Sequence, residues 1–172
     1  MPLDETLARV DADLAAGRVP LARQRLRGLV GSYPWDLTLR RRLAEVYRLY
    51  GDAAEAGRWT YLEEDRAPEE TAAFERRYVS ARWRMKALAW RGPEALAATA
   101  FAAERLAEVR EACAAEVGRP VDWDEPVPFD GDGEGLPDVG GRSGCVVVTV
   151  GAFLGGTVMA GIWLKGLLSL FE

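Results

Sequence analysis

Arginine side chains are the groups in this sequence best suited to bind a ligand, and they gather in two stretches. The first stretch consists of Arg40, Arg41, Arg42, Tyr47 and Arg48. Because a guanidinium group binds a carboxylate through two parallel hydrogen bonds, this stretch predicts contact with an unidentified protein or peptide. The alternative is a solvated helix face, on which the arginines pair with neighbouring Asp and Glu side chains.

The second stretch combines basic side chains with tryptophan. Its basic members are Arg76, Arg77, Arg82, Arg84 and Lys86. Such a mixture is typical of nucleic-acid-binding surfaces, and it also suits a helix that lies on anionic lipid. Two tryptophans seven residues apart in this stretch are equally typical of a packing seam between helices. Residues 1–117 hold nineteen basic and nineteen acidic side chains, so nucleic acid is the less favoured partner.

Catalytic groups are scarce in this sequence. It has no histidine, which removes the usual general base at neutral pH and the commonest metal ligand. Its two cysteines, Cys113 and Cys145, lack the spacing of a metal site and have no base to activate them. We therefore expect no catalytic residue, no bound metal and no cofactor.

Residues 118–143 predict a flexible acidic linker. They are rich in Gly and Pro and hold two basic against seven acidic side chains, so the segment repels itself. Asp130, Asp132 and Glu134 stand at the first, third and fifth positions of an EF-hand calcium loop. Gly141 occupies the position of the bidentate glutamate on which such a loop depends, so we prefer a linker to a calcium site.

Apolar residues recur at helical spacing throughout residues 1–117, and Gly and Pro interrupt them at helical lengths. The pattern predicts about six helices. Asp36 is suited to cap the third, and Asp52 with Glu55 forms a capping box that opens the fourth. The expected helices end near Gly17, Tyr33, Gly51, Pro68, Trp90 and Val117, the fifth being a long one over residues 69–90.

A repeat of 34 residues relates the first four of these helices. It separates three pairs of identical residues: Gly17 and Gly51, Ala22 and Ala56, and Pro34 and Pro68. A period near this value is typical of stacked helix pairs. The second unit, LAEVYRLYGDAAEAGRWTYLEEDRAP, resembles the tetratricopeptide repeat (TPR) through Leu43-Ala44, Tyr47, Gly51-Asp52, Ala56 and Pro68.

The TPR resemblance covers residues 3–70 and implies two antiparallel helix pairs, which a divergent pair follows. It also implies a concave face, made largely by the first helix of each pair, on which partners bind, and a packing role for Ala56. The stretch from LARVDADLAAGRVPLARQRLRGLV to AGRW is similar as well to an actinobacterial family of unknown function. That similarity implies no activity.

Residues 145–164, CVVVTVGAFLGGTVMAGIWL, contain no charged residue. Twenty helical residues rise about 30 Å, the thickness of the hydrocarbon core of a membrane. We therefore expect a transmembrane helix over residues 144–167 and a short tail over residues 168–172. The alternative is that this segment docks in a groove of the helical body. Four small residues can support a homodimer within the membrane, namely Gly151, Gly155, Gly156 and Ala160.

The start of the chain predicts on which side of the membrane the body lies. Residues 1–17 are acidic and amphipathic, and they lack the basic and apolar regions of a secretory signal. The expected protein is therefore all-α, with a cytoplasmic TPR-like domain over residues 1–117 and a single pass through the inner membrane. Its expected function is non-catalytic: it holds a cytoplasmic partner near that membrane.

Overall fold

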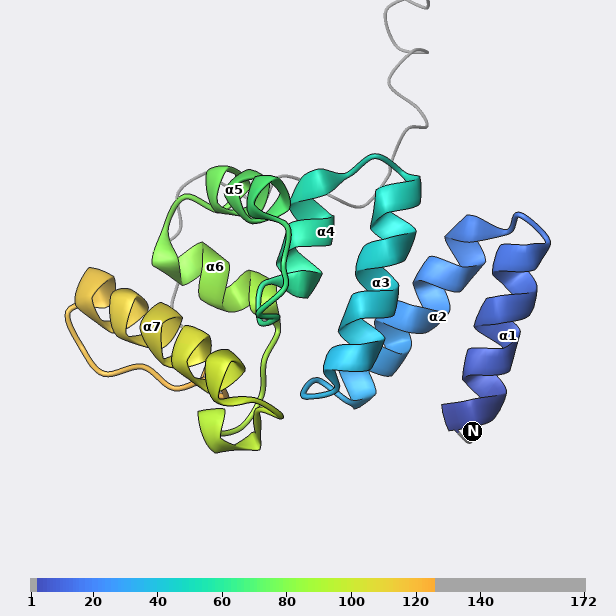
Figure 1. Ribbon diagram of the computed structural model, residues 1–172. Helices are drawn as coiled ribbons and strands as arrows, with labels where there is room; N and C mark the ends of the chain where they lie inside the picture. Colours follow the sequence, from blue (N-terminus) through green and yellow to red (C-terminus); the bar gives the residue numbers. More distant parts are fainter. Residues whose placement is uncertain (1–2, 126–172) are drawn as a thin grey trace, which may run out of the picture. The chain divides into compact units, whose positions relative to one another are not determined.

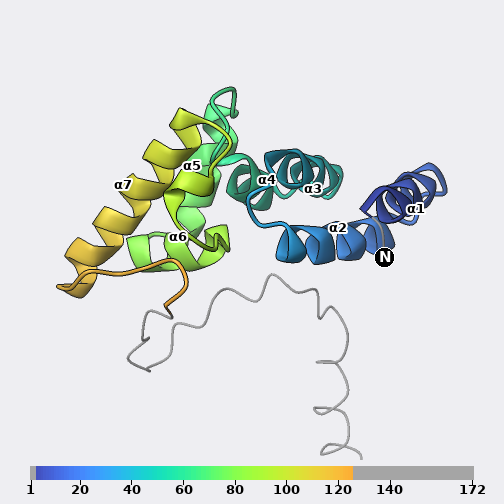
Figure 2. The ribbon, with the colours of Figure 1, turned by 90° about the horizontal axis from the view of Figure 1, so that it is seen from below.

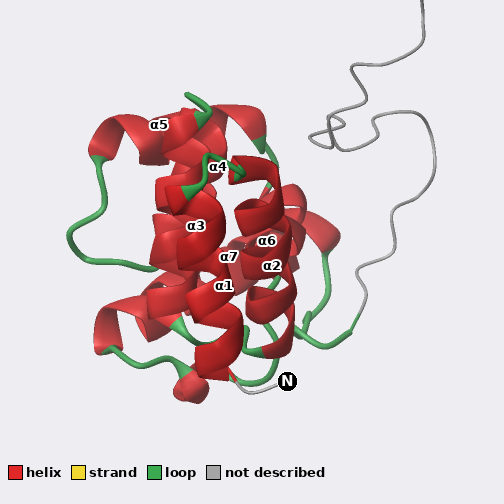
Figure 3. Cartoon of the chain, turned by 90° about the vertical axis from the view of Figure 1, so that its right-hand side faces the viewer, coloured by secondary structure: helices red, strands yellow, loops and turns green. Residues whose placement is uncertain are grey.

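The computed structural model describes residues 3–125, and within that range it is entirely helical, without a strand (Figure 3). All of these residues belong to the first of the two units into which the chain divides, residues 1–130. The elements are α1 (Leu3–Ala15), α2 (Val19–Ser32), α3 (Leu37–Leu49), α4 (Ala53–Thr60), α5 (Pro68–Arg77), α6 (Ala81–Leu88), the 3₁₀ turn η1 (Glu94–Leu96) and α7 (Ala100–Val117).

Helices α1 to α5 pack in chain order, each against the next, and α6 packs against α7 (Figures 1 and 2). Short connections make the neighbours α1 and α2, and α3 and α4, antiparallel pairs. Helix α4 also contacts α6, so the second pair lies beside the C-terminal helices. A hydrophobic core lies among α1 to α4 and includes Val10, Leu26, Leu43 and Trp59.

Local capping explains where several helices begin. The Asp36 carboxylate accepts hydrogen bonds from the amides of Thr38 and Leu39, at 2.9 and 3.2 Å, which confirms its predicted role at α3. Asp52 likewise accepts from the amide of Glu55 at 3.1 Å. The Glu55 side chain does not return this bond, because the Asp52 amide already donates to the Tyr47 carbonyl. The predicted capping box is therefore half correct.

The fourth helix is shorter than predicted. It ends at Thr60 instead of continuing to Pro68, and the chain then turns, with the Glu63 amide donating to the Thr60 carbonyl at 2.9 Å. The turn carries Glu63 back to α3, where its carboxylate meets Arg41. An ion pair between distant parts of the sequence thus competes with continuation of the helix.

The predicted fifth helix over residues 69–90 is two helices, α5 and α6. The break falls at residues 78–80, where the Ser80 hydroxyl accepts from the amide of Trp83 at 3.2 Å. The Glu116 carboxylate of α7 accepts from the amide of Ala81 at 2.8 Å. A carboxylate near unpaired amides stabilises the start of a helix, so α7 helps to begin α6 at this point.

Helices α4 and α5 approach each other at Gly57 more closely than a side chain at that position would allow. A Cβ atom added to Gly57 would lie 2.0 Å from the carbonyl oxygen of Glu70. Real atoms do not come this close, so only glycine fits where α5 crosses α4. Ala56, the neighbour for which the resemblance implies a packing role, is fully buried.

Candidate functional site

Two residues of the first arginine-rich stretch lie inside the protein. The Arg40 side chain is 0% exposed and lies between the rings of Trp59 and Trp90, 5.6 and 5.7 Å from their centroids. Tyr47 is only 3% exposed. These positions correct the prediction for Arg40 and Tyr47, because neither side chain can reach a partner at the surface.

Arg40 instead holds the end of α6, together with a second arginine. Its Nη2 atom donates to the Leu88 carbonyl at 2.9 Å, and its Nε atom donates to the Pro34 carbonyl at 2.7 Å. Arg58 donates through Nε to the Ala87 carbonyl at 2.5 Å. The last carbonyls of a helix lack partners within it and carry partial negative charge. The two guanidinium groups therefore cap α6 and attach it to α3 and α4.

The burial of Arg40 has an electrostatic cost. Burial, and secondarily the charge of Arg58, lowers the pKa of Arg40 to about 9. Because this value lies above neutral pH, the side chain stays a cation at pH 7. The carbonyls and tryptophan rings around it supply the negative potential that a carboxylate would otherwise supply.

The other three arginines are partly exposed, and each is paired with a carboxylate of another segment. Arg41 donates through Nε to both carboxylate oxygens of Glu63, at 3.0 and 2.9 Å. Arg48 forms two parallel bonds with Glu70 of α5, at 2.7 and 2.8 Å. Arg42 pairs with Asp11 of α1. The pairs with Glu63 and Glu70 raise the pKa of Arg41 and Arg48. The geometry is that of the alternative interpretation, a helix face on which the arginines are already paired.

A hollow of about 630 Å³ opens beside Arg41, between the start of α3 and the loop after α4. We call it the α3 hollow. It is lined by Leu37, Thr38, Arg41, Leu62, Glu63, Glu64, Asp65 and Thr99. Its charged residues are one arginine and three carboxylates, so the lining has a net charge of 1 − 3 = −2.

The second, basic stretch is divided between α5 and α6, and its members point in different directions. Arg77 lies 2.9 Å from the Asp52 carboxylate, on the side of α4. Lys86 lies over the ring of Trp83, 5.2 Å from its centroid. Arg82, which lies 4.0 Å from Glu116, lines one hollow together with Lys86. Arg76 is exposed at the end of α5, and Arg84 donates to the Val79 carbonyl at 3.4 Å. Trp90 is buried and lies beyond the end of α6, so it does not share one helix face with Trp83 as expected.

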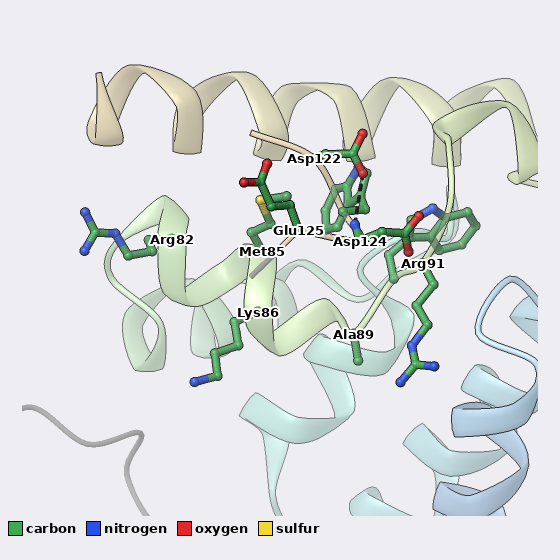
Figure 4. Close-up of a pocket in the computed structure, with 10 residues that line it drawn as sticks. Arg82, Met85, Lys86, Ala89, Arg91, Asp122, Asp124 and Glu125 are labelled. Carbon is green, nitrogen blue, oxygen red and sulfur yellow. Dashed lines mark hydrogen bonds between the residues drawn. The ribbon is translucent and has the colours of Figure 1, made fainter. Parts of the chain in front are cut away.

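A second hollow, of about 530 Å³, lies between α6 and the chain that follows α7 (Figure 4). Its acidic lining residues, Asp122, Asp124 and Glu125, face it from the start of the acidic segment. The charged ends of Arg82, Lys86 and Arg91 point away from these carboxylates (Figure 4). A phosphate group that approached α6 here would meet carboxylates as well as cations, which disfavours a nucleic-acid surface.

The beginning of the acidic segment is attached to the helical body. The indole of Trp123 donates to Glu94 at 3.0 Å, and the Asp124 carboxylate accepts from the Gly92 amide at 3.0 Å. Val121 is buried. Trp123, Asp124 and Val121 therefore attach the start of the acidic segment to η1 and the residues before it.

A buried polar pair that sequence reasoning missed joins α4 to the end of α5. The Tyr78 hydroxyl donates to the Glu55 carboxylate at 2.9 Å, and both side chains are about 1% exposed. Arg58 donates to the other oxygen of Glu55 at 3.1 Å. The position of Glu55 in the first turn of a helix suggested a cap, and no sequence signal linked it to a tyrosine 23 residues later.

The remaining predicted site residues, Gly151, Gly155, Gly156 and Ala160, lie outside the described residues, as does the predicted transmembrane helix. Within residues 3–125, none of the helices has the length and apolar character needed to span a membrane. The same residues contain no group of three or more side chains that could hold a metal ion.

The described part of the chain defines an all-helical protein of successive packed helices whose surface carries hollows. Over its whole length, residues 1–172, the sequence matches a family of unknown function, DUF6584, and the chain belongs to that family. Neither a curated protein nor a solved structure matches it.

Proposed function

We propose that this protein is a TPR-like protein–protein interaction module that is held at the inner membrane by residues 144–167, with its helical body in the cytoplasm. The role is non-catalytic: the body binds a partner protein or peptide and keeps it near the membrane. The observation that carries the proposal is the α3 hollow. It opens on the first helix of the second pair, which is the surface that the repeat resemblance assigns to partners.

The geometry of residues 34 positions apart supports the repeat. Gly17 and Gly51 end α1 and α3 with nearly the same left-handed backbone, at φ of 70° and 69°. Ala22 and Ala56 follow them at the same distance and are both fully buried. Equal conformation and equal burial at equivalent positions are what a stacked array of helix pairs requires.

The partner-binding role is tested by affinity purification of the full-length chain in a mild detergent. Thr38→Trp fills the α3 hollow, and the change is tolerable because Thr38 is exposed and only its backbone takes part in capping. Gln24→Trp, at an exposed position of α2, is the matched control. We expect the same proteins to be retained by the wild type and the control and lost by Thr38→Trp. Equal retention by Thr38→Trp, at an unchanged melting temperature, would contradict the proposal.

The membrane attachment is tested separately by cell fractionation. The full-length chain is expected to remain with membranes after carbonate extraction, whereas a chain that ends at Ser143 is expected in the soluble fraction. Identical behaviour of the two chains would refute the anchor. Protease outside spheroplasts should leave the body intact if it is cytoplasmic.

The second candidate is a nucleic-acid or anionic-lipid binder that uses the basic stretch of residues 74–91. The division of that stretch between two helices and the inward direction of Arg77 count against it. Salt-sensitive retention of nucleic acid or anionic vesicles, in place of defined proteins, would favour this second function.

A further inference from the structure

We infer that the partner segment that binds at the α3 hollow is cationic, rich in Lys or Arg, although the arginines of residues 40–48 suggest the opposite charge. The inference rests on the proposed function and names the class of its partner. It depends on three features of the hollow: the existing hydrogen bonds of Arg41, the excess of carboxylates over cations, and the apolar residues of the lining.

Two of the three nitrogen atoms of the Arg41 guanidinium group, Nε and Nη2, are engaged within the protein. Its Nε atom bonds to both Glu63 oxygens, and its Nη2 atom lies 2.7 Å from Glu63 and 2.7 Å from Asp65. An acidic partner that formed two parallel hydrogen bonds with this group would need Nη2, and would therefore have to displace these carboxylates. Glu63 is only 8% exposed, so its displacement would leave a buried carboxylate without its cation, which is strongly unfavourable.

The carboxylates beside Arg41 are in surplus. Glu64 is exposed and forms no ion pair among the described residues. The Asp65 side chain is 69% exposed and offers a second oxygen, because Arg41 contacts only Oδ1. Both carboxylates can therefore accept hydrogen bonds from an incoming ammonium or guanidinium group. Since residues 1–117 are neutral as a whole, this negative charge is a local property of the hollow.

The floor of the hollow suits the long carbon chain of a basic residue. Leu37, which is partly exposed, contributes apolar surface, and the almost fully buried Leu62 lines the hollow as well. Lys and Arg commonly lay their methylene groups on apolar surface while the charged end stays near water and carboxylates. A basic side chain therefore matches both parts of the lining.

The same charge excludes the acidic segment of the chain itself as the occupant. Residues 126–143 carry Asp130, Asp132, Glu134 and Asp138 against a single basic residue, Arg142. Like charges in an interface oppose binding, so this segment is repelled from Glu64 and Asp65. Residues 144–167 hold a single charged residue, Lys165, and the proposed function assigns them to the membrane, so the occupant is a segment of another protein.

The inference is tested by fluorescence anisotropy with the full-length chain in a mild detergent. Three labelled peptides of equal length have alternating Leu and a variable residue, which is Arg in the first, Glu in the second and Gln in the third. We expect only the Arg peptide to bind, and its binding to weaken in about 0.5 M salt. The double variant Glu64→Gln, Asp65→Asn should weaken it by about tenfold or more.

A matched double variant controls for total charge. Glu104→Gln with Glu111→Gln removes two exposed carboxylates from α7, neither of which lines the hollow. The inference is overturned if the Glu peptide binds as tightly as the Arg peptide, or if the Arg peptide does not bind. It is overturned too if Arg-peptide binding survives loss of Glu64 and Asp65, since the peptide then binds elsewhere on the chain. In each case, the affinity purification with the Thr38→Trp variant tests the proposed function independently of the charge of the partner.

Discussion

Replacing Arg40 by methionine is the sharpest test of how the C-terminal helices are attached. Methionine has a similar length and an apolar character, so it can fill the space between Trp59 and Trp90 without a charge. It cannot donate a hydrogen bond. The Arg40→Met variant therefore removes the donors to the carbonyls of Pro34 and Leu88 and changes little else.

The expected magnitude follows from two opposed effects. Each of the two buried carbonyls that loses its donor costs about 1–3 kcal/mol. In the other direction, methionine removes the cost of burying a charge that has no carboxylate partner. It also removes the Nη1 atom of Arg40, a buried donor that has no hydrogen-bond partner in the wild type. We expect the carbonyls to dominate and the free energy of unfolding to fall by roughly 2–4 kcal/mol.

Thermal unfolding followed by circular dichroism measures this change. For a body of this size the loss corresponds to a melting temperature roughly 8–15 °C lower. Arg27→Met, at an exposed position of α2, controls for the loss of an arginine as such and should shift the melting temperature little. A variant Arg40→Met that melts at or above the wild-type temperature would refute the reasoning, because burial of the charge would then outweigh the capping of α6.

Three further variants test single contacts. Gly57→Ala should destabilise the body by roughly 2–3 kcal/mol in urea unfolding, since the new Cβ would meet the Glu70 carbonyl; an unchanged midpoint would rule out the close crossing of α4 and α5. Ala89→Gly should raise stability by about 0.5–1 kcal/mol, because Ala89 ends α6 with φ of 48°, and a lower stability would show that this conformation carries no strain. Burial, and secondarily the Glu55 charge, raises the pKa of Tyr78 to about 12. The folded state therefore holds the Tyr78 hydroxyl proton more tightly than the unfolded state, so the free energy of unfolding should fall as pH rises from about 10 to 12. In the Tyr78→Phe variant, the free energy of unfolding should decrease less over this pH range. If the variant and the wild type show the same pH dependence, other groups cause the decrease.

Sequence reasoning predicted the first three helices well, because their signals are local. The apolar spacing, Asp36 as a cap and Gly51 as a stop lie within a few residues of the boundaries that they set. The later boundaries depend on distant partners. Glu63 turns back to Arg41, and Glu116 caps α6 from another helix. No pattern within a single helix contains that information, so α4 was predicted too long and α5 and α6 were predicted as one.

The helical spacing of the sequence indicates that Arg40 is buried, although its charge suggests an exposed position. Successive residues of a helix point about 100° apart, so three consecutive arginines cannot share one face. Arg40, Ala44 and Tyr47 follow the spacing i, i+4, i+7 and are all buried. That spacing placed Arg40 on an inward ridge, but a cation is rarely buried without a carboxylate, and its partners proved to be carbonyls.

The two faces of α3 separate a structural role from the proposed binding role. Arg40 faces inward and holds α6, while Arg41 faces outward and fixes the loop that forms the wall of the α3 hollow. Glu63 therefore belongs to the fold, since its buried carboxylate determines where that loop lies. Glu64 and Asp65, which the loop presents to solvent, can change without loss of this anchor. Substitution of Glu63 should impair folding and binding together, whereas substitution of Glu64 and Asp65 should impair binding alone, and this difference distinguishes a binding surface from a structural ion pair.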